Sequence, residues 1–297
     1  ETSTIDLTAL TVSLTRVSDS KATALNDGMN CLLGSDPFVR TPSPTPMPPP
    51  SPTPVPTPHP TRLPTLSPTA APTPRPSVVD PFNCSGAGAL PIQVLSTDSG
   101  ETYQAKALNL ATGAYAALYT VPLPWPQPKL NSVAISPVDG KAYATVHSTQ
   151  SGVRNYLVRF DSSTVEFVAR LPLSGDTNSK DFFAGAMDPV NGDFYLASQT
   201  RIWKFAGVDQ LPGYNTHDRA WGSADFSSAL PTVTTTVALG ADFVVFDSAA
   251  IESGATATTH KYAMGINVNK VRLVNLDTSA GWTLTANDGM QLGDGNW

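Results

Sequence analysis

The sequence contains few charged residues and no cluster of basic ones. Charged side chains make up 14% of the chain, and its formal net charge is −6. Such a chain has nothing to neutralise the phosphates of a nucleic acid or to hold it against an anionic membrane surface. It also lacks an apolar run of about 18 residues, the length that spans a bilayer. We therefore expect no nucleic-acid partner and no membrane insertion.

Motifs that carry enzymatic chemistry are also missing. No Gly-x-Ser-x-Gly, His-Glu-x-x-His or glycine-rich phosphate loop occurs. The acidic pairs Asp98/Glu101 and Asp288/Asp294 lack the regular oxygen spacing of a calcium loop. We expect no catalytic residue, metal or cofactor, although a pocket assembled from distant positions stays open. The histidines are scattered without metal-ligand spacing: His59, His147, His217 and His260.

The chain has two cysteines, Cys31 and Cys84, one on each side of a proline-rich tract. Asn83-Cys84-Ser85 is an N-glycosylation sequon, which predicts a glycan on Asn83. The sequence begins at Glu1, without an initiator methionine or a charged-then-apolar leader. We interpret it as a mature chain whose secretion signal is gone, or as a piece of a longer protein. A secreted, oxidising setting is expected, in which the cysteines form a disulfide.

The tract itself cannot belong to a helix or a sheet. Sixteen of the 36 residues at positions 41–76 are proline, most of them alternating with Ser or Thr. Proline fixes φ and lacks a backbone donor, and it keeps the preceding residue out of the α region. The segment is therefore expected to be a polyproline II rod that rises roughly 3.1 Å per residue and reaches about 110 Å.

Three interpretations of the rod remain open: a semi-rigid spacer, a ligand for SH3- or WW-type domains, and a glycan-coated rod. Its Ser-Pro and Thr-Pro units resemble hydroxyproline-rich, O-glycosylated glycoproteins of the extensin type, and also mucin-like stalks. The resemblance implies sugars on hydroxyls and, in an algal or plant host, on hydroxylated prolines. The candidate O-glycosylation positions are Thr41, Pro42, Ser43, Pro44, Thr45, Pro46, Pro48, Pro49, Pro50, Ser51, Pro52, Thr53, Pro54, Pro56, Thr57, Pro58, Pro60, Thr61, Thr65, Ser67, Thr69 and Thr73.

Two hairpin patterns recur after Cys84. "SVAISPVDGKAYATV" (132–146) and "AGAMDPVNGDFYLAS" (184–198) share a Pro-Val-Asp/Asn-Gly turn, and their prolines lie 52 residues apart. A strand, a short polar turn and another strand recur at 108–115, 158–167 and 271–282. A period of roughly 40–50 residues is typical of propeller blades.

These motifs resemble the β-propeller-like repeat domains of bacteria and algae. The resemblance implies a mainly β fold with four or five blades over about residues 90–286. A β-sandwich with similar hairpins is the alternative, but it has no reason to keep the repeat period. We interpret the aromatic residues Trp203, Trp221, Trp282, Tyr143 and Tyr195 as core rather than as a sugar-binding platform, because most are in phase with the strands.

The first 35 residues look like part of the same β system. Residues 4–17 alternate strongly and change phase near position 8, which predicts two strands separated by a bulge or turn. "NDGM" occurs both at 26–29 and at 287–290. A two-stranded piece is not stable alone, so it must pair with a sheet. The apolar positions expected to dock on that sheet are Ile5, Leu7, Leu10, Val12 and Leu14.

The location of that sheet depends on the rod. If the rod is straight, the leading strands cannot reach their own propeller, and Cys31 cannot pair with Cys84 of the same chain. The strands would then join a neighbouring copy, an intermolecular disulfide would lock the joint, and a filament would grow. If the rod bends back, the cysteines pair within the chain and the strands complete its own last blade.

We expect three segments: an N-terminal strand segment (1–35) that docks or completes a ring, a polyproline II rod (36–84) and a propeller-like domain (85–297). The sequence favours an extracellular structural glycoprotein, not an enzyme, whose partners are further copies of itself and covalent glycans. Self-assembly would be head-to-tail, into a fibril, surface appendage or wall component. The alternatives are a stalked carbohydrate-binding or adhesive propeller, and a propeller hydrolase or lyase.

Overall fold

The computed structural model describes only part of the chain, and every structural statement below concerns these residues. Described in full are residues 2–6, 11–15, 26–29, 77–97, 102–124, 128–148, 153–172, 184–240, 242–247, 260–267 and 270–285.

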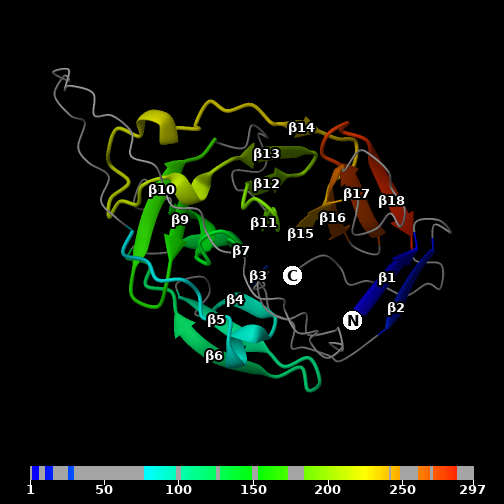
Figure 1. Ribbon diagram of the computed structural model, residues 1–297, viewed down its shortest axis with the longest axis horizontal. Coiled ribbons are helices and arrows are strands. Elements are labelled where there is room, and N and C mark those ends of the chain that lie inside the picture. The colour runs from blue at the N-terminus through cyan, green and yellow to red at the C-terminus, as the bar shows by residue number, and fades with distance from the viewer. Residues whose placement is uncertain are drawn as a thin grey trace, which may run out of the picture.

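Four four-stranded antiparallel sheets form a β-propeller arrangement (Figure 1), so the fold is mainly β, as predicted. Strands adjacent in sequence pair in each blade. From the inner to the outer strand, the blades are β3 (Asn26–Met29), β4 (Ile92–Ser96), β5 (Tyr103–Leu108) and β6 (Tyr115–Thr120); β7 (Lys129–Ile135), β8 (Ala142–Ser148), β9 (Val153–Phe160) and β10 (Val165–Arg170); β11 (Ala184–Met187), β12 (Phe194–Ser198), β13 (Arg201–Phe205) and β14 (Val233–Thr234); and β15 (Phe243–Asp247), β16 (Lys261–Asn267), β17 (Lys270–Asn275) and β18 (Gly281–Thr285).

The inner strands of the four blades line the middle of the ring. β7 contacts both β3 and β11, and β11 in turn contacts β15. Figure 1 shows β6, β10, β14 and β18 at the periphery. β7 and β11 approach so closely that a Cβ at Gly185 would lie 2.6 Å from the Cβ of Ser132. Glycine at this position therefore lets two blades meet at the centre.

The blades pack face to face, and this packing explains the long apolar runs in the sequence. All five residues of β12 are buried, because both faces of the strand are covered by neighbouring blades. The largest side chains in the interior include Tyr143, Phe160 and Phe194, each at most 1% exposed. One cluster of buried residues joins the first three blades, and a second joins the third and fourth.

The first recurring pattern forms the turn between the two innermost strands of the second and third blades. Ser136 N–H donates to Lys141 O (2.9 Å), and Asp188 N–H makes the equivalent bond to Asp193 O (2.9 Å). Both turns end at a glycine with positive φ, 69° at Gly140 and 72° at Gly192. The 52-residue repeat is therefore one hairpin used twice.

The second recurring pattern forms the outer hairpins β5–β6, β9–β10 and β17–β18. At each, one side-chain oxygen accepts hydrogen bonds from two backbone amides further along the turn. Asn109 accepts from the residues at 111 and 112, Asp161 from those at 163 and 164, and Asn275 from those at 277 and 278. Asn and Asp stabilise turns through such bonds, so these residue types recur at equal positions in three blades.

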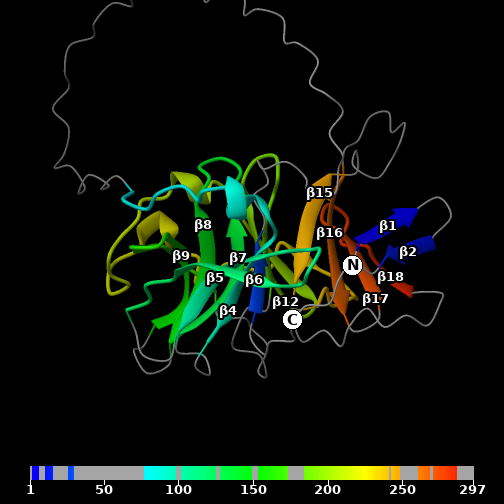
Figure 2. The same cartoon turned by 90° about the horizontal axis from the view of Figure 1, so that it is seen from below.

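The N-terminal pattern also has a counterpart. β1 (Thr2–Asp6) and β2 (Thr11–Thr15) pair antiparallel, with Ile5 opposite Val12. They form a separate two-stranded sheet, which Figures 1 and 2 place beside the blade that ends in β18. Leu7 and Leu10 lie outside the described residues, so docking by this apolar set stays a prediction.

Candidate site where the proline tract joins the propeller

β3 completes the first blade of its own chain. Met29 pairs with Ile92 and Asn26 with Leu95, which places β3 between β4 and β7 at the centre of the ring. The straight-rod expectation that the leading segment cannot reach its own propeller therefore does not hold for β3. The self-closing alternative expected completion of the last blade, whereas β3 fills the innermost position of the first blade.

The chain that follows the tract is fixed first to the second blade. We call residues 77–85 the entry segment. Ser77 Oγ donates to Oε2 of Glu166 (2.9 Å), and Val78 N–H donates to Oε1 of the same carboxylate (2.8 Å). Phe82 N–H donates to Gly140 O (2.7 Å). The tract thus leaves the propeller at the outer part of the second blade, away from β3.

A buried ion pair holds this anchor in place. Arg159 Nε lies 2.7 Å from Glu166 Oε2, and the two side chains are 3% and 6% exposed. Arg159 also donates to Leu211 O (3.1 Å). A Cβ at Gly213 would lie 2.5 Å from Cδ of Glu166, so only glycine fits beside the pair. We call Ser77, Val78, Arg159 and Glu166 the entry clamp.

The hydrogen bonds of the clamp control the charge of Glu166. Burial raises the pKa of this carboxyl, but the amide of Val78, the guanidinium of Arg159 and the hydroxyl of Ser77 together outweigh burial and lower its pKa below the ordinary value of 4.5. The carboxylate therefore remains ionised near neutral pH. The available signal in the sequence was the pair itself, since Arg159 and Glu166 are register partners on β9 and β10.

The cysteine and sequon positions lie at the end of the entry segment. Cys84 is half-buried against the core, and it is not a free thiol. Asn83 is exposed, and its Oδ1 accepts from the Ser85 amide (3.0 Å) and hydroxyl (2.6 Å). Cys31 and all candidate O-glycosylation positions from Thr41 to Thr73 lie outside the described residues.

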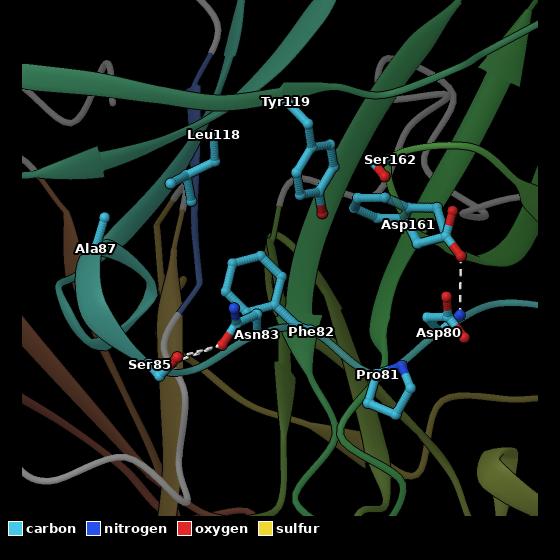
Figure 3. Close-up of a pocket in the computed structure, with 11 residues that line it drawn as sticks. Asp80, Pro81, Phe82, Asn83, Ser85, Ala87, Leu118, Tyr119, Asp161 and Ser162 are labelled. Atoms are coloured by element: carbon cyan, nitrogen blue, oxygen red, sulfur yellow. Dashed lines mark hydrogen bonds between the residues drawn. The ribbon is translucent and has the colours of Figure 1, made fainter.

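A pocket of about 410 Å³ opens beside Asn83, between the first and second blades (Figure 3). Its walls come from the entry segment, from β6 and from the turn between β9 and β10. Figure 3 shows Tyr119 descending from β6 between Phe82 and Asp161. Asp161 Oδ2 accepts from the Asp80 amide (2.8 Å), which ties the two walls together.

Two polar groups at this pocket have unusual environments. The Tyr119 hydroxyl is buried and lacks a hydrogen-bond partner among the described residues. Burial raises the pKa of Tyr119, and the charge of Asp161 raises it further. Burial also raises the pKa of Asp161, but bonds donated by Asp80, Ser163 and Thr164 outweigh burial and lower that pKa below 3.8. The phenol thus stays protonated beside an ionised carboxylate.

The third and fourth blades are joined by a second buried charge cluster. Lys261 Nζ lies 2.6 Å from Oδ2 of Asp188 and 2.8 Å from Oδ1 of Asp247. Asp188 is fully buried and also caps its own turn by accepting from Val190 N–H (3.0 Å). Sequence reasoning missed this contact, because its three members come from three different strands or turns.

The aromatic residues fall mostly where predicted. Four of the five are buried in the core: Trp203, Trp221, Tyr143 and Tyr195. Trp282 was assigned to the core wrongly. It is 44% exposed, because it lies on the outermost strand of its blade, β18, and packs at only 6.3 Å (ring centroids) from Tyr262. An outermost strand has no further strand beside it to bury such a side chain.

The histidines remain apart in the structure as they are in the sequence. His260 Nδ1 lies 3.2 Å from a carboxylate oxygen of Asp277, and the ring of His217 lies beside those of Tyr156 and Phe167. Across the described residues, no group of three or more His, Cys, Asp or Glu side chains is placed to hold a metal ion. Within that same part, no helix is both long and apolar enough to cross a membrane.

Comparison with known proteins adds no relative to this description. No protein-family model matches the chain, and no curated protein matches it.

Proposed function

We propose that this chain is a secreted structural glycoprotein that assembles head-to-tail, with β3 of one copy completing the first blade of the next. The observation that carries the proposal is the place of β3. It is a four-residue strand at the centre of the ring, and the proline tract separates it from the strand with which it pairs. The other three inner strands belong to continuous blades.

The contacts that hold β3 do not depend on which copy supplies it. The same antiparallel register with β4 forms if the strand comes from a neighbour, as in domain swapping. What differs is the connector. A polyproline II rod reaches about 110 Å when straight, and folding it back forces proline-rich backbone out of its preferred basin. Stiffness of the connector thus favours exchange over self-closure.

A disulfide between Cys31 and Cys84 would lock the exchanged strand. Cys31 follows Met29 by two residues, and Cys84 precedes Ile92 on the chain leading into the same blade. Because Met29 and Ile92 are register partners, Cys31 belongs near Cys84 of whichever copy hosts β3. An exchanged strand then gives a covalent link between copies, and a self-closed strand gives a closed monomer.

Glycans would coat the assembly. The resemblance of the tract to hydroxyproline-rich glycoproteins implies O-linked sugars, and the exposed Asn83 offers an N-linked position. Sugars on a rod between successive propellers would shield it from proteases and keep neighbouring filaments apart. This role is structural and requires no catalytic step.

Two single-cysteine variants test strand exchange directly. Cys31→Ser leaves only Cys84, and Cys84→Ser leaves only Cys31, so neither can form the native bond alone. Mixed and reoxidised, the two should give a disulfide-linked heterodimer, because β3 with Cys31 from one variant enters the blade with Cys84 of the other. The measurement is non-reducing electrophoresis with differently tagged chains.

Each variant incubated alone serves as the control, since random thiol pairing would give homodimers as readily as heterodimers. A band at twice the monomer mass that appears mainly in the mixture, and disappears with reductant, supports exchange. A mixture that stays monomeric would contradict it and leave the stalked carbohydrate-binding propeller as the better function, for which the pocket beside Asn83 is the supporting observation.

A further inference from the structure

We propose that the pocket between the first and second blades is a saccharide site that takes one or two neutral pyranose units. Its volume of about 410 Å³ falls within the roughly 300–1,000 Å³ of small-ligand pockets. Like such pockets, it combines apolar walls with a few convergent polar groups. The argument rests on the chemistry of those groups and on their position beside a glycosylation sequon.

The apolar walls suit the face of a sugar ring. Phe82 and Tyr119 line the pocket with their ring centroids 6.3 Å apart and their planes tilted by 51°. Leu118 extends the same wall on β6. Aromatic side chains offer large, rigid apolar surfaces against which the C–H face of a pyranose can pack.

The polar groups suit hydroxyls rather than a charged ligand. Asp80 and Asp161 contribute carboxylates, Asn83 an amide and Ser162 a hydroxyl. No lysine, arginine or histidine is among the lining residues, so a phosphate, sulfate or uronate would meet repulsion without compensation. Ligand hydroxyls can donate to both carboxylates and accept from the amide.

The buried Tyr119 hydroxyl is a second, independent sign of a ligand. A buried hydroxyl without a partner is costly and calls for an explanation. Among the described residues nothing satisfies it. Because Asp161 is ionised and the phenol is protonated, this wall presents a donor beside an acceptor, the pairing that recognises a hydroxyl group. A sugar hydroxyl placed there would supply the missing partner.

The position of the pocket indicates where the sugar comes from. Asn83, the sequon asparagine, itself lines the pocket, so a glycan linked to its amide starts at the rim. The protein's own glycan would then wedge between the two blades and the entry segment, where the tract meets the propeller. This choice of source rests on the glycosylation proposed above, whereas the pocket as a saccharide site does not.

The test separates the site from the source. The full chain is secreted without glycans into a bacterial periplasm, where thiols oxidise, and saturation-transfer NMR is recorded with methyl glycosides of glucose, galactose and N-acetylglucosamine. At least one should receive saturation. Asp80→Asn should weaken binding roughly tenfold, because a charged acceptor is lost. Asp209→Asn, in the turn after β13 and outside the pocket, is the matched control and should bind as the unchanged chain does.

No saturation with any of the three glycosides, or equal binding by Asp80→Asn and Asp209→Asn, overturns the saccharide site. The glycosylated chain then identifies the source. If it does not bind the free glycoside but glycosylated Asn83→Gln does, the Asn83 glycan occupies the pocket. If the glycosylated chain binds as well as the bare one, the occupant is a saccharide from outside, and the choice of the protein's own glycan is wrong.

Discussion

At the scale of single residues, the junction between tract and propeller depends on Glu166. This carboxylate accepts from Ser77 and from the Val78 amide while it faces the buried guanidinium of Arg159. Removing one member of a buried ion pair leaves the other charge uncompensated, which costs far more than the intact pair contributes. Glu166 is therefore the residue whose loss should damage both the second blade and the anchoring of the tract.

Glu166→Gln should lower the free energy of unfolding by about 3–5 kcal/mol at pH 7, because Arg159 is left buried without its counter-charge. Denaturant unfolding followed by tryptophan fluorescence measures the loss. Asp218→Asn, which changes an exposed carboxylate in a loop, should alter stability by less than about 0.5 kcal/mol. Equal stability of Glu166→Gln and the unchanged chain would show that the clamp does not hold the fold.

The same carboxylate makes stability depend on pH in a defined direction. The pKa of folded Glu166 is below 4.5, its ordinary value, so its contribution is complete above about pH 4.5 and is lost as the pH falls through the folded value. Melting temperatures from pH 7 to pH 3 should therefore fall more steeply for the unchanged chain than for Glu166→Gln. Parallel curves would contradict this assignment.

At the scale of elements, β3 is the least securely held strand of the ring. It contributes four residues, and a long connection separates it from its blade, so little entropy is lost when it leaves. Without β3, the backbone groups of β4 that pair with it become an open edge at the centre of the ring. An open edge of this kind recruits any strand of matching register, whichever chain provides it.

A chain lacking residues 1–35 should therefore accept a synthetic peptide of residues 22–33 with Cys31→Ser. Its melting temperature should rise with peptide concentration, and the added stability should reach about 2.7 kcal/mol at 100 times the Kd. Differential scanning fluorimetry and a fluorescent peptide measure both effects. The matched control is the same peptide with Gly28→Pro, which cannot present a regular strand. Failure to bind, or equal binding of both peptides, would rule out strand exchange.

At the scale of the whole molecule, the proline tract decides whether a copy closes on itself or joins another. The entry clamp fixes one end of the connection at the second blade, and β3 lies at the centre of the ring. A stiff rod between those points must turn back to close the ring, whereas a flexible chain can do so readily. The proposed assembly is thus a consequence of backbone stiffness.

Replacing residues 41–76 with an equally long Gly/Ser segment should convert polymers into closed monomers. Such a segment has an end-to-end distance of about 30–36 Å instead of about 110 Å, so β3 would find its own blade first. Analytical ultracentrifugation and negative-stain electron microscopy of the full chain measure the distribution. Polymers of unchanged length in the Gly/Ser variant would show that stiffness is not the cause.

The local pattern of the sequence predicted what depends on neighbours along the chain. Turn glycines at 140 and 192, and the Asn or Asp residues that begin the outer turns, recur because turn geometry is a short-range property. Repetition of these turns indicated blades. By contrast, Trp282 was misplaced, since alternation identifies the faces of a strand and does not reveal whether the strand is outermost.

The sequence by itself determined a mainly β, repeating fold and a stiff tract, because strand alternation, turn chemistry and proline geometry act over a few residues. Only the tertiary structure decided that β3 takes the innermost place in the first blade, that Glu166 anchors the entry segment, and that Asn83 shares a pocket with Tyr119 and Asp161. Those contacts join residues far apart in the chain, and which of them meet depends on how the blades close into a ring.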